Sequence, residues 1–267
     1  MHRDPRRAVG LAAILVVALT ACGASADDTK GGEGAAAQSE KEQLRTMVDQ
    51  VDAMKVVEWR GQLLTANPDS GGKQILELSG RYDPGSGSST LAMDSVLDGE
   101  VQQVDYVVVD GRTYFNSDDW GAGAEDCYVD ITDDASRTWA IPRDLDPRWS
   151  VNKARAVRPI GSGVAVDVRG SRLMDGLPRG LFQDVPAAVD KIKVRAIVKG
   201  HGPLVEVAVD VAGMWGKVPP EALAGFDTRR SGWWAMTMRE SGDGSPIEEP
   251  RHVFDNTVTA PTQCTRA

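Results

Sequence analysis

Apolar and polar residues alternate with a period of two along most of the chain after residue 55. In the first such segment, Val57, Trp59 and Leu63 are separated by polar side chains. Successive side chains of a β-strand point to opposite faces, so this pattern predicts strands with one apolar and one polar face. We expect about eleven strands, near residues 56–66, 76–82, 91–97, 104–108, 113–116, 154–158, 164–169, 192–199, 205–211, 234–239 and 252–260.

Two dipeptides indicate that neighbouring strands run antiparallel. Asp98-Gly99 and Asp110-Gly111 tolerate the positive φ angles of two-residue hairpin turns. Consecutive antiparallel strands with one polar side form a sheet with one face in water. The pattern therefore predicts an α+β protein that is mainly β.

A helical period precedes the strands. Ser39 and Glu42 form a capping box, in which a serine at the N-cap is followed three residues later by glutamate. Apolar residues then recur at helical spacing and predict an amphipathic helix to about Lys55. Its apolar residues are Leu44, Met47, Val48 and Val51. Short helices are expected near residues 171–177 and 184–190, and loops with short helices over 117–150.

The N-terminus is typical of an exported protein. Three arginines precede an apolar run from Ala8 to Leu19, which is too short for a spanning helix. The run ends in Leu19-Thr20-Ala21-Cys22, which resembles the bacterial lipobox, whose cysteine receives a diacylglycerol and becomes the mature N-terminus. An ordinary signal peptide, or an uncleaved anchor with a chance cysteine, is the alternative.

This pattern gives the expected domain organisation. Residues 1–21 are a signal peptide, and residues 22–38 are the lipidated cysteine with a small, polar, glycine-rich tether. Residues 39–267 form a single domain, although the length also allows two small ones.

The composition is acidic. The formal net charge is −9, and loss of residues 1–21, whose three arginines and one aspartate carry +2, leaves −11. Nucleic acid and anionic bilayer surfaces are therefore unexpected as electrostatic partners. Attachment to a membrane depends on the lipid, and two acyl chains suffice for it.

Two cysteines remain after acylation of Cys22. In an exported protein, Cys127 and Cys264 are candidates for a disulfide bond. Two buried free thiols are the alternative. Metal binding is less expected, because no histidine or third thiol lies near them in the sequence.

No catalytic or metal-binding motif is convincing in this sequence. The mature chain has two histidines, His201 and His252, without metal-ligand spacing. Two S-x-x-K matches, Ser70 to Lys73 and Ser150 to Lys153, precede strands or lie in a turn, whereas serine acyl enzymes place this pair on one helical turn. We expect no enzyme activity, no metal and no cofactor.

In each of the clearest strands, the apolar residues occupy every second position. Successive side chains point to opposite faces, so a meandering sheet gathers these residues on one face. A highly curved sheet with few helices would leave its concave side incompletely filled, and the resulting apolar cavity would take a hydrophobic ligand. Ordinary core packing of these side chains is the alternative. The candidate cavity residues are Trp59, Leu63, Leu76, Leu78, Met93, Tyr106, Val108, Val194, Val207, Trp234, Met236 and Met238.

In the order of its elements the chain resembles the actinobacterial lipoproteins of the LppX/LprAFG type, whose fold is similar to that of LolA and LolB. The resemblance rests on Cys22, the capped helix, residues 56–66 and 191–212, and the ending 254–261. The sharpest local match runs from residue 104 to 114. The chain differs from the family in its tryptophan-rich middle, in the 213–232 connection and in the cysteine pair.

The resemblance implies a half-barrel, a strongly curved antiparallel sheet with helices over its concave face. It also implies a lipoprotein on the outer face of the cytoplasmic membrane, facing the cell wall, that binds or carries a lipid or lipid-linked molecule without catalytic residues. An envelope scaffold that binds another protein and no ligand is the main alternative, and an enzyme is the third.

We predict that Cys22→Ser releases the protein from the membrane fraction, because the lipid is its expected anchor. Fractionation and immunoblotting before and after a salt wash measure this release. A Cys22→Ser protein that stays membrane-bound after the wash contradicts lipid anchoring.

Overall fold

The computed structural model describes residues 40–97, 100–120, 127–134, 136–138, 140–152, 155–160, 163–181, 187–223 and 232–254. All of them belong to one compact unit, residues 38–267. The expected signal peptide, Cys22, the tether, the Asp98-Gly99 turn, Lys153 and Cys264 lie outside the described residues.

Twelve strands form one open sheet, in the order β12-β6-β5-β4-β3-β2-β1-β11-β10-β9-β8-β7. The prediction of a mainly β protein with a curved, open sheet and helices is confirmed. The strands are β1 (Val57–Leu64), β2 (Gln74–Asp83), β3 (Ser88–Leu97), β4 (Glu100–Val109), β5 (Arg112–Ser117), β6 (Cys127–Asp130), β7 (Arg155–Ile160), β8 (Gly163–Arg169), β9 (Lys193–His201), β10 (Leu204–Asp210), β11 (Trp233–Glu240) and β12 (His252–Phe254).

The described helices are short apart from the first. They are α1 (Glu40–Asp52), α2 (Trp149–Asn152), α3 (Gly170–Gly176) and α4 (Val211–Trp215). Single 3-10 turns are η1 (Pro68–Ser70), η2 (Asp118–Trp120), η3 (Arg179–Leu181), η4 (Ala187–Lys191) and η5 (Pro220–Leu223). The amphipathic helix and the helix near 171–177 are therefore confirmed within a few residues.

Three details differ from the sequence prediction. Strand β6 lies in the region expected to hold only loops and short helices. Strand β12 pairs with β6 in parallel, so the sheet is not wholly antiparallel. Val211 begins α4 instead of extending a strand, because the carboxylate of Asp210 accepts a hydrogen bond from the Gly213 N–H at 2.7 Å and caps the helix.

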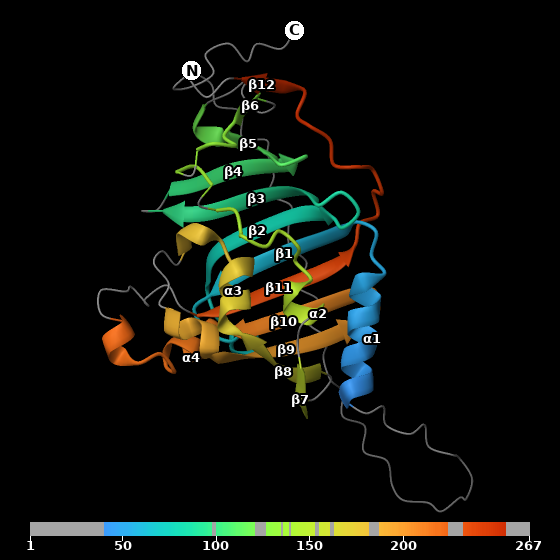
Figure 1. The fold of residues 1–267 in the computed structure, drawn as a ribbon, viewed down its shortest axis with the longest axis vertical. Coiled ribbons are helices and arrows are strands. Elements are labelled where there is room, and N and C mark those ends of the chain that lie inside the picture. Colours follow the sequence, from blue (N-terminus) through green and yellow to red (C-terminus); the bar gives the residue numbers. More distant parts are fainter. Residues whose placement is uncertain are drawn as a thin grey trace, which may run out of the picture. The chain divides into compact units, whose positions relative to one another are not determined.

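The four α-helices gather over the part of the sheet that β7 to β11 form (Figure 1). Buried residues of these helices, such as Leu44, Val151, Leu173 and Met214, share one core cluster with the apolar face of the strands. Over β4 the cover is the chain that follows β6, where the Tyr106 hydroxyl donates a hydrogen bond to the Arg137 carbonyl oxygen at 2.9 Å. The sheet thus has one covered apolar face and one face on which none of the described α-helices lies (Figure 1), and we call the second one the polar face.

The hairpin between β4 and β5 has the predicted turn. Asp110 and Gly111 have φ angles of 50° and 78°. Both angles are positive, as in the two-residue turn whose twist matches the flanking strands. The register of β4 and β5 continues directly from this turn.

Residues 241–251, which we call the strap, connect β11 to β12 across the polar face. Arg81 on β2 donates hydrogen bonds to the carbonyl oxygens of Asp243 and Ser245, at 2.8 and 2.7 Å. Further along, Ile247 packs in a small buried cluster with Val107, Val109 and Tyr114 of β4 and β5. The strap therefore ties the middle of the sheet to its β6 edge.

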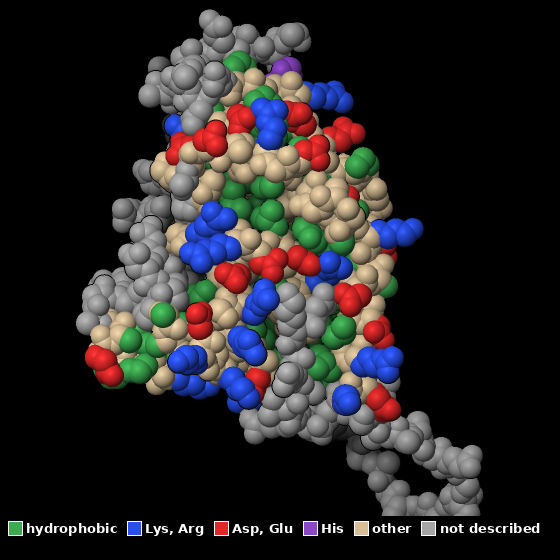
Figure 2. Space-filling view, in the orientation of Figure 1, with side chains coloured by type: hydrophobic (Ala, Val, Ile, Leu, Met, Phe, Trp, Pro, Cys, Tyr) green, Lys and Arg blue, Asp and Glu red, His purple; other side chains and the backbone are tan. Residues whose placement is uncertain are grey.

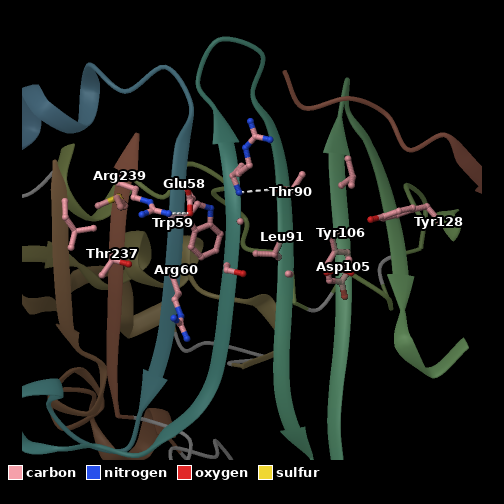
Figure 3. Close-up of a pocket in the computed structure, with 17 residues that line it drawn as sticks. Glu58, Trp59, Arg60, Thr90, Leu91, Asp105, Tyr106, Tyr128, Thr237 and Arg239 are labelled. Atoms are coloured by element: carbon pink, nitrogen blue, oxygen red, sulfur yellow. Dashed lines mark hydrogen bonds and ion pairs between the residues drawn. The ribbon is translucent and has the colours of Figure 1, made fainter. Parts of the chain in front are cut away.

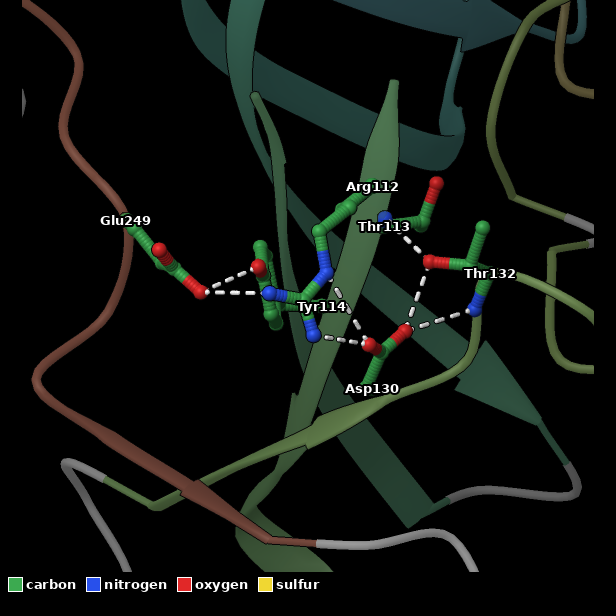
Figure 4. A network of polar contacts seen from close by, with 6 residues as sticks. All are labelled: Arg112, Thr113, Tyr114, Asp130, Thr132 and Glu249. Atoms are coloured by element: carbon green, nitrogen blue, oxygen red, sulfur yellow. Dashed lines mark hydrogen bonds and ion pairs between the residues drawn. The ribbon is translucent and has the colours of Figure 1, made fainter. Parts of the chain in front are cut away.

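Glu249 closes the strap onto β5 (Figure 4). Its carboxylate accepts hydrogen bonds from the Tyr114 hydroxyl and from Arg112, which also bonds to Asp130 on β6 at 2.6 Å. Burial and the Glu249 hydrogen bond raise the pKa of Tyr114 to about 12. The tyrosine thus remains a hydrogen-bond donor at neutral pH.

We predict that Ile247→Ala lowers the free energy of unfolding by about 2 kcal/mol, the low end for a buried isoleucine, because its cluster is small. Urea unfolding measures the loss, and hydrogen exchange should accelerate in β5 and β6 more than in β9 and β10. The exposed strap residue Glu248 offers the control Glu248→Ala, which should change neither. Equal stability of Ile247→Ala and the wild type contradicts the anchoring role.

Candidate functional site

The residues predicted to line an apolar cavity lie on the helix-covered face, on strands β1 to β4 and β9 to β11. The β1–β11 register places Leu63 opposite Trp234 and Trp59 opposite Met238. Val108 is half-buried, and the other predicted residues are at most 6% exposed. The structure therefore brings the predicted set together in one continuous apolar layer.

This layer is closely packed in the structure. Leu63, Leu78 and Met93 have no accessible surface, so no void that admits a water-sized sphere adjoins them. A hydrophobic ligand would enter only if side chains or covering helices moved. The large cavity expected from the sequence thus stays a prediction.

Three side chains bring polar groups into this apolar layer, and one of them, the Tyr106 hydroxyl, bonds to the Arg137 carbonyl oxygen. The indole nitrogens of Trp59 and Trp234 are buried, and among the described residues no hydrogen-bond acceptor reaches them. The Trp234 ring lies directly against Gly61, where an added Cβ would be 2.3 Å from the ring. A buried donor without a partner costs about 1–3 kcal/mol, so an oxygen atom placed here by a ligand would be favourable.

A groove of about 690 Å³ lies on the polar face (Figure 3). It crosses β4, β3, β2, β1 and β11, and the strand register arranges its side chains in two adjacent rows. One row contains Asp105, Ala92, Ser79, Arg60 and Thr237, and the other contains Val107, Thr90, Arg81, Glu58 and Arg239. This groove could not be predicted from the sequence, because its polar residues have the pattern of an ordinary solvated face.

The arginines of the groove already have partners. Arg239 is 2.6 Å from Glu58, and Arg60 is 2.6 Å from Glu77. Arg81 is held by the strap. Burial acts to raise the pKa of Glu77, but hydrogen bonds from Arg60 and Gln62 outweigh it and lower this pKa.

Asp105 stands at the opposite end of the groove in a different environment. Burial raises the pKa of its carboxyl group, and the negative charges of Asp94 and Asp118 add to this effect. The pKa of Asp94 is raised as well, first by burial and then by Glu77. The ionised carboxylates near Asp105 therefore repel one another at neutral pH.

The serines and histidines weighed in the sequence are dispersed. The hydroxyls of Ser70 and Ser150 donate to the carbonyl oxygens of Asn67 and Pro147. His201 is 3.6 Å from Glu206, and His252 lies on β12 opposite Cys127. Within the described residues, no three histidine, cysteine or acidic side chains converge as a metal site would require.

Cys127 is 2% exposed at the start of β6. Its expected partner, Cys264, and the expected lipid anchor, Cys22, lie outside the described residues. The disulfide and the anchor therefore stay predictions.

The surface carries both charge signs. Acidic and basic side chains are interspersed over the face shown in Figure 2. Among the described helices, none combines the length and apolar character needed to cross a bilayer.

Comparison with known proteins found no match to this chain. No protein-family model matches the chain, and no curated protein matches it.

We predict that Asp105→Asn raises the free energy of unfolding at pH 7. A carboxyl group whose pKa is raised in the folded state destabilises the folded protein when it ionises. The free energy of unfolding therefore falls as pH rises from the unfolded pKa of this group, about 3.9, through its folded pKa. The gain should therefore shrink as pH falls toward 4, which urea unfolding at both pH values measures. The matched control, Asp133→Asn, removes an exposed carboxylate and should change little. A less stable Asp105→Asn protein at pH 7 contradicts this account.

Proposed function

We propose that this chain is a lipid-anchored, extracytoplasmic binding protein that takes a hydrophobic molecule between the sheet and its helices. The resemblance to the LppX/LprAFG lipoproteins and the lipobox motif support this proposal. The structural observation that carries it is the pair of buried indole donors, Trp59 and Trp234, within a largely apolar layer. An acyl chain with an ester or carboxyl oxygen has the matching chemistry.

The layer has the means to rearrange around such a ligand. Methionine side chains are flexible and adapt to irregular shapes, and they are common at surfaces that accept varied partners. Six of them belong to the core cluster: Met47, Met54, Met93, Met214, Met236 and Met238. The cover also includes α2, α3 and α4, of four, seven and five residues, which pack as separate short pieces. Small shifts of these short helices would open space for an acyl chain.

An envelope scaffold without a ligand is the second candidate. The close packing of the predicted cavity residues favours it, since the layer resembles an ordinary core. Lipid that co-purifies with the protein distinguishes the two candidates.

We predict that the released Cys22→Ser protein carries lipid in native mass spectrometry and binds a fluorescent phospholipid analogue. Trp59→Phe or Trp234→Phe should weaken this binding by about 2–10-fold, because each removes one hydrogen bond worth roughly 0.5–1.5 kcal/mol and keeps an aromatic ring.

The matched control is Trp149→Phe, the same substitution at a buried tryptophan of α2 in this cluster. It should leave the affinity unchanged. A wild type that carries no lipid and binds no analogue overturns the proposal and supports the scaffold. Equal effects of the three substitutions would show that the indole groups of Trp59 and Trp234 do not contact the ligand.

A further inference from the structure

We propose that the groove on the polar face is a second binding site, for a neutral oligosaccharide. It lies on the opposite side of the sheet from the apolar layer, so it does not depend on lipid uptake. Its volume of about 690 Å³ falls within the roughly 300–1,000 Å³ of small-molecule sites.

The charges in the groove favour a neutral ligand. Arg239 and Arg60 each have a carboxylate partner at 2.6 Å, and Arg81 is held by strap carbonyl oxygens. A phosphate or carboxylate ligand would have to displace these partners. A metal ion is not favoured either, because the acidic residues near Asp105 do not converge as a metal site among the described residues.

The same side chains offer many hydrogen bonds to neutral hydroxyl groups. Arg60 and Arg239 are 58% and 59% exposed, and a guanidinium group has five donors, of which the ion pairs use only part. Hydroxyl groups of Ser79 and Thr90 lie on the two strands between Arg60 and Asp105, and the Thr237 hydroxyl lies beyond Arg60 on β11. The groove thus presents both donors and acceptors, which polyhydroxylated ligands can use together.

The shape of the groove also selects the ligand class. It runs across five strands, a width of about 19 Å at the usual strand spacing. All five strands are paired on both sides, so their backbone groups are not available to an added peptide strand. Ser79 and Ala92, at the centre of the groove, have small side chains, so they leave space on its floor. A chain of sugar rings fits this combination.

The test uses the full-length protein in a detergent without sugar groups, titrated with chitotriose, maltotriose and mannotriose by calorimetry. We expect at least one trisaccharide to bind with a Kd of about 1 mM or tighter. Ala92→Leu fills the floor and should weaken that binding at least about tenfold, and Thr237→Val, which removes one hydroxyl group at nearly constant volume, about 2–10-fold.

The matched control is Ala208→Leu, which enlarges an alanine on the same face of β10, outside the groove. It should leave the affinity within about twofold of the wild type. Absence of binding for all three trisaccharides overturns the proposal. It is also overturned if Ala92→Leu and Ala208→Leu have the same effect, or if a charged peptide binds the groove and the trisaccharides do not.

Discussion

The pairing of β1 with β11 holds the molecule together. Eight residues of each strand are in register, although about 170 residues separate them and no hairpin joins them. Without this ladder, strands β1 to β6 with β12, and strands β7 to β11, would form two separate sheets with exposed edges. The ladder also builds both candidate sites, because Trp59 and Trp234 lie on its apolar side, whereas Arg60 and Arg239 lie on its polar side. Gly61 is the residue at which this pairing leaves room for the Trp234 ring.

Alternation and turn chemistry predicted most of the fold from the sequence, since strands such as β9 and β10 are long enough to show a clear period. Strand β6 escaped detection because four residues in a glycine-rich region do not establish a period. The parallel partner of β12 depends on where the strap leads the chain, which no local pattern encodes. The apolar layer could be predicted from the alternation of apolar and polar residues along each strand alone. The groove could not be predicted, because it exists only when the register aligns outward residues such as Ser79 and Ala92 from neighbouring strands.

The two faces differ in how their polar groups are satisfied. On the covered face, most side chains are apolar, and the indole donors of Trp59 and Trp234 lack partners among the described residues. On the polar face, charged groups neutralise one another over short distances, as Arg239 and Glu58 do. On the first face, binding is therefore favoured when the incoming molecule supplies a hydrogen-bond acceptor to a buried donor. On the second face it must match an existing arrangement of donors and acceptors without disturbing the ion pairs.

The strap has a consequence for how copies of this protein behave at high concentration. An exposed strand edge is a template for pairing with another chain, and open sheets need protection against fibre-like association. By delivering β12 to β6, the strap covers that edge with a strand that has three residues in the described part of the chain. The opposite edge, β7, contains Pro159, which has no backbone N–H to donate. Within the described residues, both end strands of the sheet are thus poor templates for pairing, which favours an open sheet that persists as a monomer.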